Sequence, residues 1–174
     1  MKRVASVLFL VCLLVSLLFS CGGTERYDLT EETFFYGLTT MQLYPEEYVG
    51  KVISFDCFTY RLTDVTGKEY LCGVRKCSAG YGCNCGKDTV IGFILEYDGE
   101  IPEPKNQSED TPDKAWIHVE GTIASSNSEE IRIYAYDATG RVNYDTVESV
   151  VFYRFAVSSL VEIDGTGLAY YVTK

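Results

Sequence analysis

Three cysteines gather in one short, glycine-rich stretch of the chain. Cys77, Cys83 and Cys85 fall within nine residues, and glycines on either side would let the backbone wrap around an ion. Soft thiolate ligands favour zinc or Cu(I) over hard cations. The candidates for a fourth ligand are Cys72, Cys57 and, less favoured, His118. The stretch therefore indicates a thiolate metal site for zinc or copper.

Two other kinds of thiol chemistry stay open for the same residues. Outside the cytoplasm, two disulfides among Cys57, Cys72, Cys77, Cys83 and Cys85 would staple a long loop, each contributing about 2–4 kcal/mol. One thiol would then stay free, and Cys57 suits that place. A thiol-redox role is the third alternative, because Arg75 and Lys76 would lower the pKa of the neighbouring thiol. No Cys-x₂-Cys motif supports thioredoxin-like exchange.

The N-terminal segment has the features of a secretory signal. Lys2 and Arg3 precede an apolar run over Val4–Phe19, which at about 16 residues is short for a membrane-spanning helix. The sequence Leu-x-Ser-Cys that ends at Cys21 resembles a bacterial lipobox. Cys21 would then be the lipid attachment point, and the protein would be anchored to a membrane of the bacterial cell envelope, facing away from the cytoplasm. An uncleaved anchor or an ordinary secreted protein is the alternative.

The charge balance excludes several function classes. The chain has 174 residues, with 15 Lys and Arg against 25 Asp and Glu, and a net charge of −10. Without residues 1–20 the balance is 13 against 25, or −12. Such a field repels phosphate, so we expect no nucleic-acid partner and no attraction to anionic lipid headgroups. A single histidine and the absence of a Gly-x-Ser-x-Gly motif leave no residue that we assign as catalytic.

The elements that must position these residues are mostly strands. A helix is expected over 30–43, ended by Pro45. Alternating or apolar runs predict strands at 52–61, 69–75, 89–97, 116–123, 131–136 and 150–163, with an edge strand at 169–172. Residues 98–114 are expected to be an exposed loop that tolerates shortening, and residues 137–149 a loop or short helix. The domains are a signal at 1–20, a tether at 21–29 and one β domain at 30–174. This order predicts a mainly β fold, a small five-stranded barrel with an N-terminal helix and a C-terminal strand extension.

Two sequence motifs add a family resemblance. The stretch Pro45-Glu-Glu-Tyr-Val-Gly-Lys51 and the strand Trp116-Ile-His-Val-Glu-Gly121 resemble an OB-fold-like domain of uncharacterised bacterial lipoproteins. A related domain occurs in the small subunit of a two-component membrane permease. The resemblance covers roughly residues 30–163. It implies an OB-fold-like barrel, location in the envelope and a membrane permease as a partner. Members often carry an adjacent cysteine pair where this chain has Cys83-Asn-Cys85.

The function that follows is binding rather than catalysis. We expect a lipid-anchored accessory module that binds a small ligand or a protein partner, with thiolate metal binding or thiol redox chemistry as the alternative. OB-folds stack ligands on aromatic side chains. The candidates for a ligand face are His118, Tyr134 and Tyr136.

Overall fold

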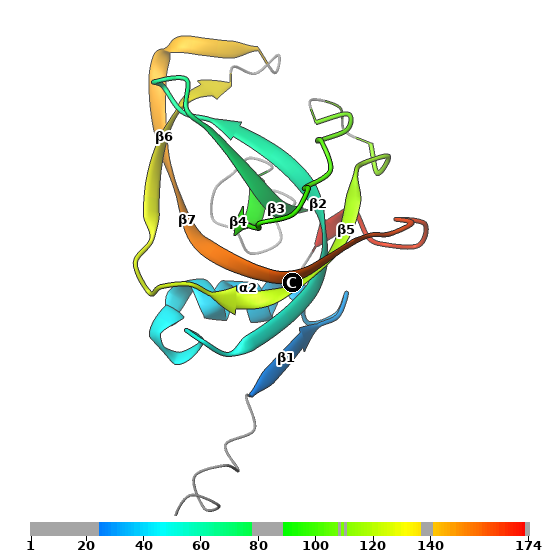
Figure 1. Ribbon diagram of the computed structural model, residues 1–174. Coiled ribbons are helices and arrows are strands. Elements are labelled where there is room, and N and C mark those ends of the chain that lie inside the picture. Colours follow the sequence, from blue (N-terminus) through cyan, green and yellow to red (C-terminus); the bar gives the residue numbers. More distant parts are fainter. Residues whose placement is uncertain (1–24, 78–88, 108, 110, 137–140, 173–174) are drawn as a thin grey trace, which may run out of the picture.

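The computed structural model describes residues 25–77, 89–107, 109, 111–136 and 141–172 (Figure 1). The mainly β character is confirmed. In chain order the described elements are β1 (Arg26–Leu29), α2 (Phe34–Leu43), the 3₁₀ helix η1 (Pro45–Glu47), β2 (Val52–Thr63), β3 (Glu69–Cys77), β4 (Thr89–Glu96), β5 (Trp116–Ile123), β6 (Glu129–Tyr136), β7 (Val142–Glu162) and β8 (Tyr171–Val172). No helix in this part of the chain is long and apolar enough to cross a membrane.

Five strands close into a ring in the order β2-β5-β7-β4-β3, with β3 pairing back to β2. Closure depends on two long strands. β2 pairs with β5 over Val52–Phe58 and with β3 over Phe58–Thr63. β7 pairs with β5 and, in parallel, with β4. Each strand of the ring therefore has a partner strand on both sides, and β1, β8 and β6 pair with parts of β2, β3 and β7 from outside the ring.

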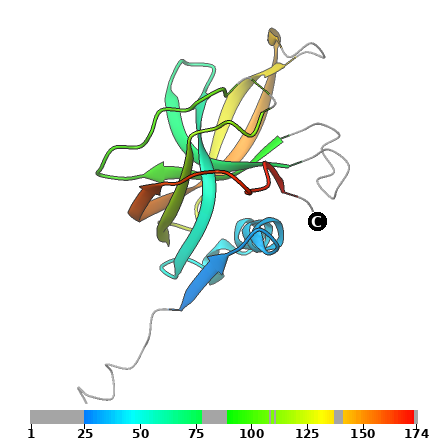
Figure 2. The ribbon, with the colours of Figure 1, turned by 90° about the vertical axis from the view of Figure 1, so that its right-hand side faces the viewer.

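The interior of the ring is filled by one side of each strand. Phe55, Phe93 and Phe155 meet there with ring centroids 5.3–5.8 Å apart. Residues of α2, which lies across one end of the ring, complete this cluster (Figure 2). Phe34 and Leu38 are the parts of the helix that enter it most deeply. The helix therefore covers this end of the ring with one face, and its other faces point outward.

A second apolar cluster lies on the other side of β3 and β4. It contains Tyr70, Cys72 and Val74 of β3, together with Ile131 of β6 and Phe152 of β7. The hairpin of β6 and the first half of β7 folds over this surface, and the chain after β7 also packs there. This double burial explains why β3 has a nearly continuous buried stretch instead of clean alternation.

Three segments differ from the sequence-based expectation. Residues 142–149, expected to be loop or helix, are the first part of β7; they are polar because little of this half of the hairpin is buried. Residues 26–29, expected within the tether, form β1, which pairs in parallel with β2. The loop expected at 98–114 is present and most of its described residues are exposed or half-exposed, but it also packs against the ring. There Lys114 is buried, and its Nζ donates hydrogen bonds to the carbonyl oxygens of Asn106 and Glu109.

Candidate functional site

A groove of about 500 Å³ lies between the β2–β3 turn and the β6–β7 hairpin. The end of β2 and the β2–β3 turn supply one wall, and β6 and β7 supply the other. Figure 1 shows both hairpins at the end of the ring opposite α2. The groove is lined by Tyr60, Arg61, Leu62, Thr63, Asp64, Val65, Thr66, Gly67, Gln107, Ile133, Tyr134, Val142 and Tyr144.

The β2–β3 turn is built around one carboxylate. Asp64 Oδ1 accepts hydrogen bonds from the amides of Thr66 (2.8 Å) and Lys68 (2.9 Å) and from the Thr66 hydroxyl (2.6 Å). Gly67 has φ +86°, a conformation that a residue with a Cβ adopts at a cost. These hydrogen bonds hold the pKa of Asp64 below its usual range, and the bond from the Thr66 hydroxyl has the largest effect. Asp64 therefore shapes the rim of the groove, and its Oδ1 is taken up by the turn.

Two tyrosines form the opposite wall. Tyr134 and Tyr144 contact each other edge to face, with centroids 5.1 Å apart, and 72% of Tyr144 is exposed. The register of the hairpin shifts between Tyr134 and Ala135, which is where the strand pair bends. The Val65 amide donates to the Arg132 carbonyl oxygen (2.9 Å), joining the turn to this hairpin. The two walls are thus fixed relative to each other.

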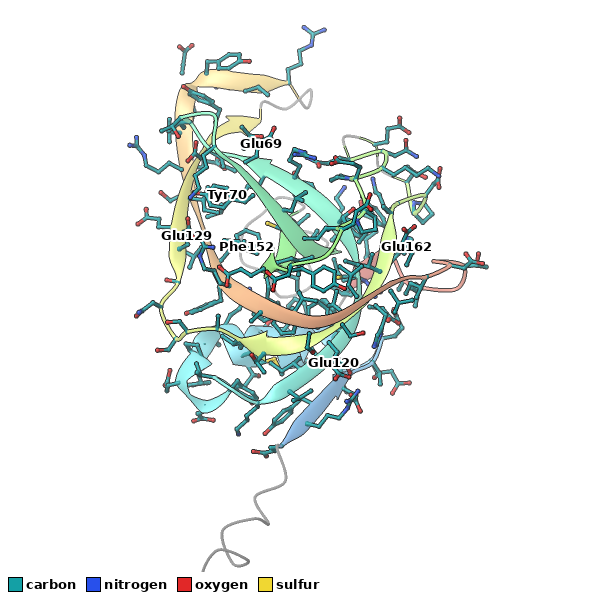
Figure 3. The ribbon with its side chains drawn as sticks, viewed as in Figure 1. Glu69, Tyr70, Glu120, Glu129, Phe152 and Glu162 are labelled. Atoms are coloured by element: carbon teal, nitrogen blue, oxygen red, sulfur yellow. The ribbon has the colours of Figure 1, made fainter. Side chains whose placement is uncertain are left out.

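One carboxylate holds the hairpin against the ring. Glu129 lies beside Tyr70 of β3, at the base of the hairpin (Figure 3), and it pairs with Arg154 and Lys68. Partial burial opposes ionisation, but Arg154, Tyr70 and Lys68 together leave the pKa of Glu129 below its usual range. The Glu129 carboxylate therefore stays charged at neutral pH and keeps β6, β3 and β7 together beneath the groove.

Gln107 closes the edge of β2 at the groove. Its side-chain oxygen accepts from the Arg61 amide and its nitrogen donates to the Arg61 carbonyl oxygen, both at 2.7 Å. The Arg61 guanidinium is itself paired with Glu69 (2.5 Å) and Glu103. Both charged lining residues, Arg61 and Asp64, therefore already have partners. The lining offers aromatic rings, hydroxyls and aliphatic groups, which suit an uncharged ligand with apolar faces.

The three residues predicted as a ligand face are separated by the fold. Tyr134 lies in the groove. His118 lies on the outside of β5, where its Nδ1 is 2.6 Å from Oδ1 of Asp56 on β2. Tyr136 pairs with Val142 through the backbone, and its side chain is outside the described part of the structure. Sequence reasoning missed Tyr60, Tyr144 and Gln107. Tyr144 lies in the segment for which the sequence predicts a loop or a short helix, so no strand pattern points to its side chain.

The described cysteines are buried in two different places. Cys57 and Cys72 are free thiols with no exposed surface; Cys57 belongs to the interior cluster and Cys72 to the second cluster. Cys77 joins Cys57 in the interior cluster, so Cys72 and Cys77 project from opposite sides of β3. With Cys57 and Cys72 both free, at most one disulfide can form among the other three cysteines of the domain.

Burial governs the chemistry of these thiols. It raises the pKa of Cys72 to about 12, and it raises that of Cys57 further even though Arg75 acts in the opposite direction. Within the described residues no group of three or more His, Cys, Asp or Glu side chains could hold a metal ion. Cys21, Cys83 and Cys85 lie outside the described residues, so the metal and redox roles of the Cys77–Cys85 loop stay predictions.

Comparison with known proteins identifies a family. A family model described as the DUF1980 C-terminal domain matches residues 17–150. The UPF0703 protein YcgQ of Bacillus subtilis is 31% identical over 107 residues, which is 60% of this chain and 32% of that protein. The chain thus spans about a third of the length of this relative. No solved structure matches it.

Proposed function

We propose, from the premise that this chain belongs to the DUF1980 C-terminal domain family, that it is a lipid-anchored binding module. In this proposal the groove between the β2–β3 turn and the β6–β7 hairpin holds an uncharged ligand outside the cytoplasmic membrane. The observation that carries the proposal is the groove itself, with three tyrosines in its lining and its charged residues already paired.

The topology supports an OB-fold for this module. Numbered within the ring, β2, β3, β4, β5 and β7 are strands one to five, and they pair in the order 1-2-3-5-4-1 with strands three and five parallel. OB-folds are five-stranded Greek-key barrels that bind oligosaccharides and oligonucleotides between the first–second and fourth–fifth strand connections. The groove occupies the corresponding place, because β6 lies in the connection between the fourth and fifth strands.

The charge of the chain selects among the ligands of such a site. A net charge of −10 opposes an oligonucleotide, since each phosphate would approach an acidic domain. An uncharged oligosaccharide avoids this repulsion, and its pyranose faces stack on tyrosine rings. An oligosaccharide is therefore the ligand class we propose.

Anchoring is the second part of the proposal. It is supported by the lipobox-like sequence ending at Cys21 and by the apolar run before it. The family resemblance adds a membrane permease as the protein partner. The anchor is tested by the mass of the chain recovered from bacterial membranes. A diacylglyceryl adduct on Cys21 is expected, with release of Cys21→Ser into the soluble fraction. An unmodified Cys21 would contradict anchoring.

Ligand binding is tested by NMR titration with neutral oligosaccharides built from glucose and from N-acetylglucosamine. Saturable shifts are expected at residues that line the groove. Tyr134→Ala should weaken binding about tenfold, since stacking on one aromatic ring contributes about 1–3 kcal/mol. The control is Tyr36→Ala, which removes an exposed tyrosine from α2. Equal weakening by both variants, or no saturable shift in the groove with any probe, would contradict the proposal.

A further inference from the structure

The outward surface of α2 and of Tyr44, which follows it, carries no charged side chain. Residues 33–45 contain no Asp, Glu, Lys or Arg, although 23% of the chain is charged. The large apolar or aromatic side chains that stay exposed on α2 and after it are Tyr36 (52%), Leu43 (67%), Tyr44 (51%) and, beyond the exposed Glu46 and Glu47, Val49 (40%). We call these four residues the uncharged patch. The polar side chains of α2 are Thr39, Thr40 and Gln42, each of them partly buried, so the exposed apolar side chains beside them suggest a surface that is covered in the working protein.

The chain enters the fold beside this patch. Glu25 pairs with Lys51 at 2.8 Å, and the Lys51 Nζ lies over the rings of Tyr27 (5.3 Å) and Tyr48 (5.4 Å). These contacts hold the start of β1 beside Tyr48, the residue that precedes Val49. Leu29 of β1 packs where Gly37 exposes the backbone of α2. β1, α2 and η1 therefore occupy the same end of the molecule (Figure 2).

The length of the preceding chain limits how far this end can lie from a membrane. Glu25 is the fourth residue after Cys21. Fully extended, this stretch spans at most about 14 Å. If Cys21 carries the lipid, as proposed above, the entry point of the chain stays within this distance of the bilayer. The groove, at the opposite end of the ring, then points away from it.

We infer that the uncharged patch rests on the bilayer surface, with Leu43 in the acyl region and Tyr36 and Tyr44 at the headgroups. Tyrosine is enriched at this depth of a membrane. The exposed Glu46 and Glu47 beside the patch oppose anionic headgroups, so the favoured surface is one of zwitterionic lipid. The anchor supplies a high local concentration of lipid, which makes a patch of only four side chains sufficient.

The inference is tested with the full lipidated chain in phosphatidylcholine vesicles that contain a lipid with a doxyl quencher near its headgroup. Leu43→Trp places an indole in the patch, and Tyr144→Trp places one on the exposed β6–β7 hairpin as a matched control. The native Trp116 is 4% exposed and contributes the same background to both. The expected result is a loss of fluorescence from Leu43→Trp and none from Tyr144→Trp. Tyr44→Trp gives a second reporter should Leu43→Trp fold poorly.

The outcomes separate this inference from the proposed function. A lipidated Cys21 with equal quenching at positions 43 and 144 would overturn the inference and leave the anchored module intact. An unmodified Cys21 would overturn both. The fluorescence of Leu43→Trp could instead change with the number of protein molecules per vesicle and not with the amount of quencher. That result would assign the patch to contact with a second copy of the chain and would also overturn the inference.

Discussion

At the scale of single residues, Arg75 is the most deeply buried charged side chain in the described part of the chain. Its side chain is 1% exposed, and its guanidinium lies over the rings of Phe34 (5.2 Å) and Trp116 (5.0 Å). It donates to a Glu31 carboxylate oxygen (2.7 Å), to the Asp56 carbonyl oxygen (3.2 Å) and to the carbonyl oxygen of Ala169. A single arginine thus joins β3, the start of α2 and the C-terminal segment. Its sequence position suggested a different role, as an activator of Cys77.

Replacing Arg75 should therefore destabilise the whole fold. We expect Arg75→Ala to lower the free energy of unfolding by about 3–5 kcal/mol, because it removes charged donors from two carbonyl oxygens and Glu31 and leaves a cavity beside Phe34 and Trp116. Urea unfolding followed by Trp116 fluorescence measures it. Arg26→Ala is the matched control, because Arg26 is half exposed in its pairs with Asp28 and Glu120. If the two variants unfold at the same urea concentration, Arg75 does not hold β3, the start of α2 and the C-terminal segment together.

At the scale of elements, the acidic, proline-rich segment between β4 and β5 contributes contacts that hold it against the ring. Besides the Gln107 contacts with β2, the Trp116 indole donates to the Pro112 carbonyl oxygen at 2.9 Å. The Lys114 Nζ also lies 5.3 Å from the Tyr170 ring centroid. This segment therefore helps to cover the second apolar cluster, and we no longer expect it to tolerate shortening.

Lys114→Met tests this role while keeping most of the side-chain volume. The variant removes charged donors from two carbonyl groups, and hydrogen bonds to charged groups contribute about 1.5–3 kcal/mol each. We expect faster hydrogen exchange across residues 103–112 and a stability loss of about that size. Lys105→Met is the control within the same segment, since Lys105 makes an exposed ion pair with Asp113. Unchanged exchange in Lys114→Met would show that other contacts hold the segment.

The strands that the sequence predicted best are those with one buried side. Residues 116–123 alternate between buried and partly exposed positions, as their pattern indicates. The first part of β7 was missed because neither of its sides is buried, so Asn143 and Tyr144 carry no periodic signal. The groove was missed for a related reason. Tyr60, Gln107 and Tyr144 come from distant segments, and only the ring closure brings them together.

At the scale of the whole molecule, lowering the pH has two opposite effects on stability. It relieves the repulsion among the many acidic side chains, and it breaks the hydrogen bonds that their carboxylates accept. The net charge of −10 makes the folded chain repel itself, and protonation relieves this. Yet many carboxylates are held by short contacts. Hydrogen bonds from neighbouring lysine, serine or threonine side chains lower the pKa of five of them: Glu25, Asp28, Asp64, Asp113 and Asp164.

The sign of the pH dependence follows from these lowered pKa values. Each folded carboxylate holds its proton less tightly than in the unfolded chain, where the ordinary values are 3.8 for Asp and 4.5 for Glu. Their stabilisation is complete above those values and is lost as the pH falls through the lower folded ones. We therefore expect the urea midpoint to change little from pH 7 to 5 and to fall below about pH 4.5.

Asp64→Asn isolates one contributor to this decline, because its turn hydrogen bonds no longer depend on ionisation. The fall below about pH 4.5 should be shallower in this variant than in the parent chain. A second series in 1 M salt separates the two effects. Salt shortens the screening length to about 3 Å, which removes long-range repulsion and leaves direct hydrogen bonds in place. A midpoint that rises steadily from pH 5 to 3 at low salt would instead mean that self-repulsion, rather than local pairing, dominates the stability of this acidic domain.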